Sequence, residues 1–285
     1  MQQLDNIKAL RALLKSWRQA GDRIAFVPTM GDLHAGHLSL VKEARNRAER
    51  VVVSIFVNPL QFGENEDFDH YPRVPDSDSE KLESEGVDLL FSPTVSELYP
   101  SGQQSVTRVV VPVIGDMLCG ASRPGHFSGV ATVVSKLLNI VQPDSTLFGE
   151  KDFQQLLIIR KMAADLCFSS DIIGVPTCRE ADGLAMSSRN RYLSDTERKL
   201  APALVRELSS VKELIESNPS ADFSQLTQQA ANNLNNMGFV TDYFEIRRAT
   251  DLAKPGCDDR DLVVVVAAWL GKARLIDNIR VGVDE

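Results

Sequence analysis

Little in this sequence is typical of a secreted, membrane-spanning or disulfide-stabilised protein. Its 285 residues include only four cysteines, none in a Cys-x-x-Cys pair, and we expect them to be reduced, buried thiols. The opening segment carries Asp5, Lys8 and Arg11 among its apolar residues, so it lacks the apolar core of a signal peptide. The longest apolar run, 262–270, is shorter than the roughly 20 residues that cross a bilayer. A cytoplasmic protein is therefore expected.

An excess of positive charge is also missing. The formal net charge is −8, and a net acidic surface gains nothing by meeting nucleic acid or anionic lipid. Any site for an anion must therefore be local. The chain is 43% hydrophobic and 25% charged, which is the usage of an ordinary folded protein, and its length allows one large domain or two unequal ones.

Alternating strand-type and helix-type segments predict a parallel sheet in the first part of the chain. Helical spacing over 7–17 leads to an extended run at 24–27, and a second helix over 38–48 leads to the apolar run 51–57, which makes a βαβ unit. Further strands are expected at 88–91, 106–111, 146–148 and 172–175, with an apolar helix over 130–141. This order predicts an α/β fold with a Rossmann-like, doubly wound parallel sheet.

The pattern changes near Pro176. Two helical stretches, 195–216 and 223–237, precede strands at 243–247, 262–269 and 273–279, the last two joined by a turn at Gly271 and Lys272. We therefore expect two domains, residues 1–175 with the parallel sheet and residues 176–285 as a smaller α+β domain. In the first domain, the segment 58–75 is rich in Gly, Pro and acidic residues, and long loops of this kind often bind ligands.

The clearest functional motif is Pro28-Thr-Met-Gly-Asp-Leu-His-Ala-Gly-His37, between a predicted strand and a predicted helix. Ligands of open α/β sheets bind at the carboxyl ends of strands, where helix N-termini attract anions. His34 and His37 add directional donors for phosphoryl oxygens. Two histidines at this spacing also fit half of a metal site or ordinary turn residues, but a metal needs a third ligand and only His70 and His126 remain.

Two further segments suit phosphate. Met186-Ser-Ser-Arg-Asn190 offers two hydroxyls beside a guanidinium, although Ser-Ser-Arg is also an ordinary loop or N-cap sequence. Phe148-Gly-Glu-Lys-Asp152 follows a predicted strand and offers Lys151 to phosphate and Asp152 to a ribose, although Asp152 could equally cap a helix. We expect each segment to lie at the carboxyl end of a strand, where one ligand could touch all three.

At these residues the sequence resembles the pantothenate synthetase family, ligases that join pantoate to β-alanine. The resemblance covers essentially the whole chain, because the motifs 57–62, 123–127 and 153–155 stand in the family's order and spacing as well. It implies that residues 1–175 bind ATP and pantoate and that residues 176–285 close over the ATP site. The wider superfamily includes other nucleotidyltransferases and the class I aminoacyl-tRNA synthetases.

The resemblance also implies roles for individual residues. His34 and His37 would contact the phosphates, and His37 would be the catalytic residue together with His34. Gln61 would hold pantoate and lie at the β-alanine position, and Gln155 would hold pantoate, although surface or capping roles fit both glutamines. The implied ATP-binding residues are Met30, Gly31, Asp32, Leu33, His34, Ala35, Gly36, His37, Gly149, Glu150, Lys151, Asp152, Cys178, Met186, Ser187, Ser188 and Arg189.

The implied reaction condenses pantoate with β-alanine through a pantoyl adenylate and releases pyrophosphate and AMP. Magnesium-ATP would be a substrate, with no tightly bound organic cofactor, no nucleic-acid or membrane partner, and a homodimer as the assembly. Carboxylates such as Asp76 and Asp78 are too numerous for spacing to identify the Mg²⁺ ligands. The rival interpretations are a nucleotidyltransferase acting on a phosphate-bearing acceptor, a metal hydrolase built on the two histidines, and a non-catalytic nucleotide-binding module.

Overall fold

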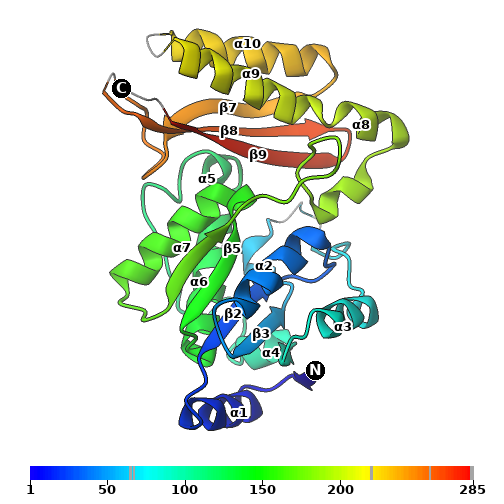
Figure 1. The fold of residues 1–285 in the computed structure, drawn as a ribbon, viewed down its shortest axis with the longest axis vertical. Helices are drawn as coiled ribbons and strands as arrows, with labels where there is room; N and C mark the ends of the chain where they lie inside the picture. Colours follow the sequence, from blue (N-terminus) through cyan, green and yellow to red (C-terminus); the bar gives the residue numbers. More distant parts are fainter. Residues whose placement is uncertain (64–65, 67, 219–220, 257, 283–285) are drawn as a thin grey trace. The chain divides into compact units, whose positions relative to one another are not determined.

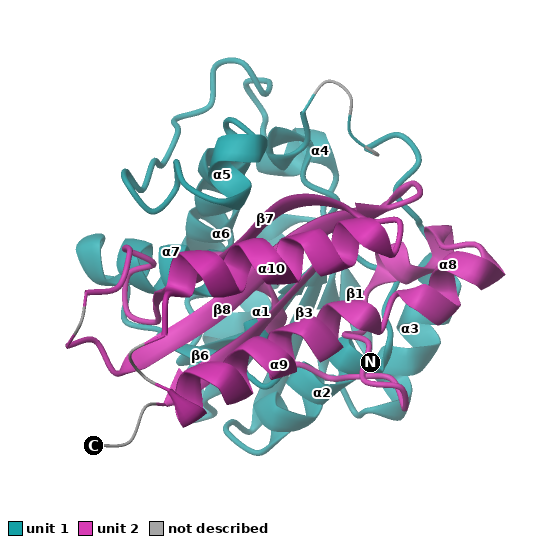
Figure 2. Ribbon diagram, turned by 90° about the horizontal axis from the view of Figure 1, so that it is seen from above, with its two compact units in different colours: residues 1–150, 155–176 teal, residues 151–154, 177–285 magenta. Residues whose placement is uncertain are grey.

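The computed structural model describes residues 1–285 except 64–65, 67, 219–220, 257 and 283–285. The chain divides into two compact units, which Figure 2 colours separately. Unit 1 comprises Met1–Glu150 and Gln155–Pro176, and unit 2 comprises Lys151–Gln154 and Thr177–Glu285. The short segment 151–154 therefore belongs with the second unit although it lies within the first part of the sequence.

Unit 1 is built on a six-stranded parallel sheet in the order β1-β4-β3-β2-β5-β6 (Figure 1). Its strands are β1 (Gln2–Leu4), β2 (Ile24–Thr29), β3 (Arg50–Ile55), β4 (Leu89–Phe91), β5 (Ser145–Gly149) and β6 (Asp171–Val175). The helices are α1 (Ile7–Gln19), α2 (Ala35–Arg45), α3 (Pro75–Ser84), α4 (Val95–Leu98), α5 (Cys119–Ser122), α6 (His126–Val141) and α7 (Phe153–Asp165), with 3₁₀ turns η1 (Pro59–Gln61) and η2 (Glu150–Asp152).

The order of these strands places a switch point between β2 and β5. From β2 the chain moves outward to β3 and β4, and it then returns to β5 on the other side of β2. Right-handed crossovers in opposite directions put α2 and α6 on opposite faces of the sheet, as the doubly wound prediction requires. Ligands of such sheets bind outside the carboxyl ends of the strands at the switch point, which here is formed by the segments after β2 and β5.

The core under α2 explains why the segment before it is held in place. Alternate residues of β2 and β3 lie on one face of the sheet, among them the buried Val27 and Val53. They pack against α2, whose buried residues here are Leu40, Val41 and Ala44. Burial of such aliphatic side chains contributes roughly 1.5–3 kcal/mol each. The turn that joins β2 to α2 therefore connects two firmly packed elements.

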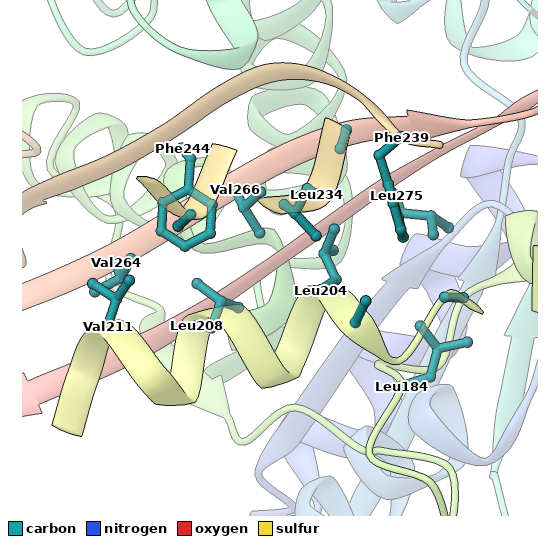
Figure 3. Close-up of a cluster of buried hydrophobic side chains, with 14 of the residues drawn as sticks. Leu184, Leu204, Leu208, Val211, Leu234, Phe239, Phe244, Val264, Val266 and Leu275 are labelled. Atoms are coloured by element: carbon teal, nitrogen blue, oxygen red, sulfur yellow. The ribbon is translucent and has the colours of Figure 1, made fainter. Parts of the chain in front are cut away.

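Unit 2 contains a three-stranded antiparallel sheet with helices packed against it. The strands are β7 (Val240–Arg248), β8 (Asp261–Leu270) and β9 (Ala273–Gly282), and the helices are α8 (Asp195–Leu200), α9 (Ala203–Ser217) and α10 (Phe223–Asn236), with the 3₁₀ turn η3 (Ser188–Tyr192). Figure 3 shows Leu204, Leu208 and Val211 of α9 facing Val264 and Val266 of β8. The smaller α+β fold expected from the sequence is confirmed.

Three details of the fold differ from the sequence-based prediction. Residues 106–111 form no strand, and Val110 is 63% exposed, because a run of β-branched residues needs a neighbouring strand and this one joins none. The expected helix 195–216 is interrupted around Pro202, which has no N–H to donate. The short strand β1 was not predicted.

The cysteines are not uniformly buried. Cys119 is buried and Cys178 is half-buried, whereas Cys167 is exposed in a turn with φ 56°, so the expectation of a buried thiol is wrong there. Cys257 lies outside the described residues. Across the described part of the chain, no helix is both long and apolar enough to cross a membrane.

Candidate nucleotide-binding and acid-binding site

The turn after β2 has a backbone that only a few residue types tolerate. Gly31 has φ 86°, and a Cβ atom placed there would lie 3.0 Å from Ile55 Cγ2 and 3.1 Å from Asp78 Oδ2. Asp32 follows with φ 53°, a left-handed conformation that aspartate accepts more readily than most residues. The left-handed φ therefore favours glycine at this position, and a side chain there would also crowd Ile55 and Asp78.

A buried carboxylate holds this turn from behind. Asp78 of α3 is 1% exposed, and its two oxygens accept the backbone N–H groups of Asp32 and Leu33, each at 2.8 Å. Lys81, one turn further along α3, donates from Nζ to the Leu33 carbonyl at 2.8 Å. Both oxygens of Asp78 are thus engaged by the turn, whereas Asp76 is exposed. In the sequence, nothing distinguishes Asp78 from the other carboxylates near the loop.

The two histidines cap the helix that follows. His34 is the N-cap residue of α2, and its Nδ1 accepts the N–H of Gly36 at 3.1 Å. His37 closes the capping box, because its Nδ1 accepts the N–H of His34 at 3.3 Å. The rings lie 4.1 Å apart between centroids. Since each Nδ1 accepts a backbone proton, the neutral form of each ring carries its proton on Nε2.

Gln61 reaches the same turn from η1. Its side-chain Nε2 donates to Met30 Sδ at 3.1 Å, and its Oε1 accepts from Asn58 Nδ2 at 3.0 Å. Gln61 is 9% exposed and Asn58 is 1% exposed. Tyr99 completes the chain by donating its hydroxyl to Asn58 Oδ1 at 2.8 Å. The sequence predicted Gln61 but neither Asn58 nor Tyr99.

A charged cluster lies behind the backbone of Gln61. Arg123 donates to Nε2 of His126 at 3.0 Å, so the ring proton of the neutral imidazole lies on Nδ1. This Nδ1–H donates to the Gln61 carbonyl at 2.8 Å. Arg123 also forms a two-pronged ion pair with Glu66, at 2.7 and 2.5 Å. Partial burial opposes ionisation of Glu66, but Arg123 outweighs it, and the pKa of this carboxyl lies below its ordinary value.

The segment after β5 is divided between the units. Gly149 ends β5 and Glu150 begins η2, both in unit 1, whereas Lys151 and Asp152 group with unit 2. Gln155 is half-buried in the first turn of α7. The position of this segment directly after a strand agrees with the sequence-based expectation.

Unit 2 brings Lys151 close to the serine motif. A small pocket is lined by Lys151, Ser187, Asn190 and Asp277 together with the apolar Leu184 and Leu275. Asn278 donates from Nδ2 to the Lys151 carbonyl at 3.0 Å, which ties the segment 151–154 to β9. Ser187 caps η3 by accepting the Arg189 N–H at 3.3 Å.

Asp277, which lines that pocket, belongs to an ion pair that the sequence did not indicate. Arg179 donates to both oxygens of Asp277, at 2.6 and 2.9 Å, and Asp277 is 3% exposed. The Met186 N–H donates to the carbonyl of Cys178 at 3.0 Å, beside the bridge between Arg179 and Ala185. The motif 186–190 therefore follows this bridge rather than coming directly after β6, contrary to the expected strand-end position.

The metal interpretation of the histidine pair gains no support. Among the described residues, no group of three or more His, Cys, Asp and Glu side chains has an arrangement that could hold a metal ion. What the turn offers instead is the positive end of the α2 helix and two imidazoles at the switch point of a doubly wound sheet. These features define the class of α/β proteins that bind an anionic, nucleotide-type ligand at a helix N-terminus.

Comparison with known proteins narrows this class. Residues 2–280 match the family model of pantoate-beta-alanine ligase. The chain is 54% identical over 284 residues to the pantothenate synthetase of Pseudomonas fluorescens, covering 100% of this chain and 99% of that one. It is 53% identical over 275 residues to that of Shewanella oneidensis, covering 96% and 97%. The chain belongs to the pantoate-beta-alanine ligase family, which confirms the resemblance predicted from its motifs.

Solved structures agree with the sequence relatives. The pantothenate synthetase of Thermus thermophilus superposes with a TM-score of 0.90 at 44% identity, covering 98% of this chain and 99% of that one. The pantoate-beta-alanine ligase of Francisella tularensis gives a TM-score of 0.81 at 36% identity, with 98% and 97% covered. That structure is a complex with beta-gamma ATP and beta-alanine. The fold of both units is thus that of the family.

Proposed function

We propose that this chain is an ATP-dependent ligase that condenses pantoate with β-alanine to form pantothenate. The observation that carries the proposal is the contact between Gln61 Nε2 and Met30 Sδ, at 3.1 Å. This contact joins Gln61, which the resemblance assigns to the acid substrate, with the turn after β2, which the resemblance assigns to the nucleotide. Membership of the ligase family supports the same activity.

The chemistry requires activation of the acid. A carboxylate does not react with an amine at neutral pH, because oxide is a very poor leaving group. In the proposed first step a carboxylate oxygen of pantoate attacks the α-phosphorus of magnesium-ATP, a P–O bond forms, and pyrophosphate leaves with the electrons of the broken bond. In the second step the amine of β-alanine attacks the acyl carbon, loses a proton, and displaces AMP.

The geometry of the turn suits the first step. The Nε2–H groups of His34 and His37 are donors on rings whose orientation the capping box holds, so little reorganisation is needed when charge develops on phosphoryl oxygens. The helix N-terminus adds a partial positive charge. We assign His37 the catalytic role, with His34 beside it. The nucleophiles are the substrates, so the proposed scheme needs no covalent enzyme intermediate.

The remaining assignments follow the family resemblance. We propose that phosphates are also bound by Lys151, Ser187, Ser188 and Arg189, and pantoate by Gln61 and Gln155. The other proposed nucleotide contacts are Met30, Gly31, Asp32, Leu33, Ala35, Gly36, Gly149, Glu150, Asp152, Cys178 and Met186. The division of labour between residues 1–175 and residues 176–285 likewise stays a prediction.

The decisive experiment measures AMP formation with each substrate omitted in turn. The proposal requires AMP release that depends on both pantoate and β-alanine, and exchange of labelled pyrophosphate into ATP that depends on pantoate alone. Exchange without pantoate, or none with it, would rule out the adenylate route. AMP or CMP transfer to a phosphate-bearing acceptor would instead indicate a nucleotidyltransferase.

Assembly and metal are proposed on the resemblance alone, and location on the composition of the sequence. We infer a homodimer in the cytoplasm that uses ATP as its magnesium complex. Light scattering should give twice the monomer mass, and a monomer mass at working concentration would contradict the dimer. Activity should disappear with EDTA and return with added Mg²⁺.

A further inference from the structure

The side chain of Gln61 is oriented by a buried, uncharged network. Asn58 makes four hydrogen bonds: its Nδ2 donates to Gln61 Oε1 at 3.0 Å and to the Gly129 carbonyl at 3.1 Å. Its Oδ1 accepts the Leu60 N–H at 3.3 Å and the Tyr99 hydroxyl at 2.8 Å. All donor and acceptor capacity of this 1% exposed amide is used.

Two of these partners decide which way the Asn58 amide points. A backbone N–H can only donate, so Leu60 requires an oxygen, and a backbone carbonyl can only accept, so Gly129 requires the NH₂ group. The close approach of η1 to α6 makes this possible, because a Cβ atom at Gly129 would lie 2.1 Å from the Leu60 carbonyl oxygen. Asn58 therefore faces Gln61 with a donor.

The orientation passes from Asn58 to Gln61. With Oε1 held by Asn58, the Gln61 amide directs Nε2 toward Met30 Sδ. A thioether is a weak acceptor, so an incoming oxygen would replace it or share the amide's second N–H at little cost. Gln61 thus presents donors to this part of the site.

Tyr99 secures the other end of the network. Its side chain is buried at 3% exposure, and burial raises the pKa of the Tyr99 hydroxyl well above its ordinary value. The hydroxyl therefore stays protonated and remains a donor at every working pH. Without it, Asn58 Oδ1 would keep only the longer bond from Leu60.

We propose that Tyr99 is a positioning residue, and that through Asn58 it fixes Gln61 as a hydrogen-bond donor that recognises an acceptor oxygen of the acid substrate. This rests on the proposed function and sharpens it. A glutamine amide can in principle serve a donor or an acceptor, and here the network selects an acceptor, such as a carboxylate or hydroxyl oxygen. It does not prepare Oε1 to receive the ammonium group of β-alanine.

The first test is Tyr99→Phe, which removes one oxygen and keeps the ring beside Phe56 and Lys136. We expect the KM for pantoate to rise about 10-fold, the scale for a lost buried hydrogen bond, with the KM for ATP nearly unchanged. Tyr243→Phe, in unit 2, is the matched control and should leave both constants unchanged. Equal pantoate KM values in Tyr99→Phe and the wild type would overturn the proposal.

A double-mutant cycle separates positioning from general loosening. If Tyr99 acts through Gln61, Tyr99→Phe should add no further loss of pantoate affinity to Gln61→Ala, as measured by direct titration with pantoate. Additive losses would contradict the relay. A uniform loss of kcat, with equal rises in both KM values, would indicate a structural role and would also overturn it.

A third measurement does not depend on activity. The ¹H–¹⁵N resonances of the Gln61 side-chain amide, identified by their absence in Gln61→Ala, should shift in Tyr99→Phe and not in Tyr243→Phe. Unshifted resonances overturn the relay whatever the substrate is. A wild type that forms no pantoate-dependent AMP overturns the proposed function instead, so the two failures are distinguishable.

Discussion

The turn after β2 and the Gln61 side chain lie side by side in unit 1, yet they are held in different ways. The turn is held by a charged group, because Asp78 binds two of its backbone N–H groups. The Gln61 amide is held by neutral groups, the Asn58 amide and the Tyr99 hydroxyl. A turn with two successive positive-φ residues needs a strong anchor, whereas an amide that selects an acid needs a fixed direction.

The largest expected effect concerns the turn. His37→Ala removes a proposed donor and half of the capping box, and we expect kcat/KM to fall about 100-fold or more, the scale for losing one preorganised donor. His70→Ala is the matched control, since His70 is an exposed histidine in the neighbouring loop. Steady-state AMP formation measures both variants. A near-normal rate in His37→Ala would move the catalytic role elsewhere.

The second largest effect is expected at Asp78, which anchors the turn after β2. Asp78→Asn sets an NH₂ group against a backbone N–H, so one donor is left unpaired, which costs about 1–3 kcal/mol. We expect a KM for ATP about 10-fold higher or more and a lower midpoint of thermal unfolding. Asp76→Asn, at an exposed position on the same helical turn, should change neither quantity. An unchanged KM for ATP in Asp78→Asn would refute the anchoring role.

A change in the neutral network around Gln61 should affect the KM for pantoate rather than the KM for ATP. Gln61→Glu is nearly isosteric but replaces the proposed donor by a carboxylate, which repels an acid substrate. We expect the KM for pantoate to rise about 10-fold or more while the KM for ATP changes little. Equal rises in the KM for ATP and the KM for pantoate would contradict the proposal that the two regions bind different substrates. Initial rates at saturating levels of the other substrates measure each constant.

The smallest expected effect concerns the charged cluster behind the Gln61 backbone. The pKa of Glu66 is lowered in the folded protein, so its ion pair with Arg123 stabilises the fold above the ordinary glutamate pKa. That contribution is lost as pH falls through the lowered value. Urea unfolding should therefore show the wild type more stable than Glu66→Gln near neutral pH, by about 1 kcal/mol or less, with the difference vanishing in acid.

A stability difference that persists unchanged into acid would contradict this assignment. Lys161→Gln, which breaks an exposed ion pair with Asp165 on α7, provides a control. It should give a difference closer to zero at every pH, because both partners are solvated.

The sequence predicted the parts of the site that are local in the chain. The position of His34 and His37 between a strand and a helix could be read from ten consecutive residues, and the doubly wound sheet from the alternation of apolar segments, but the capping box of the two histidines was not predicted. Asp78 could not be assigned, because it holds Asp32 from 46 positions away along the chain. Tyr99 lies 41 positions from Asn58 and has no local pattern to mark it.

Errors in the fold have a similar origin. The valines within 106–111 satisfy the local preference for a strand, but pairing depends on distant partners, and both edges of the sheet are formed by other segments, β1 and β6. The break at Pro202 carries a local signal that the helical periodicity on either side obscured. The periodicity of apolar residues predicts local elements, but it does not predict contacts between residues that are distant in the sequence.

The histidine cap has a consequence for redesign of this protein. Asn, Asp and Ser are the preferred residues at a helix N-cap, so a search for higher thermal stability would replace His34 by one of them. The new side chain would accept a backbone N–H at the start of α2. An aspartate there would also set a fixed negative charge where phosphate is expected. Variants selected for heat resistance alone would therefore lose function at this position, and a library for stabilisation should hold both histidines constant.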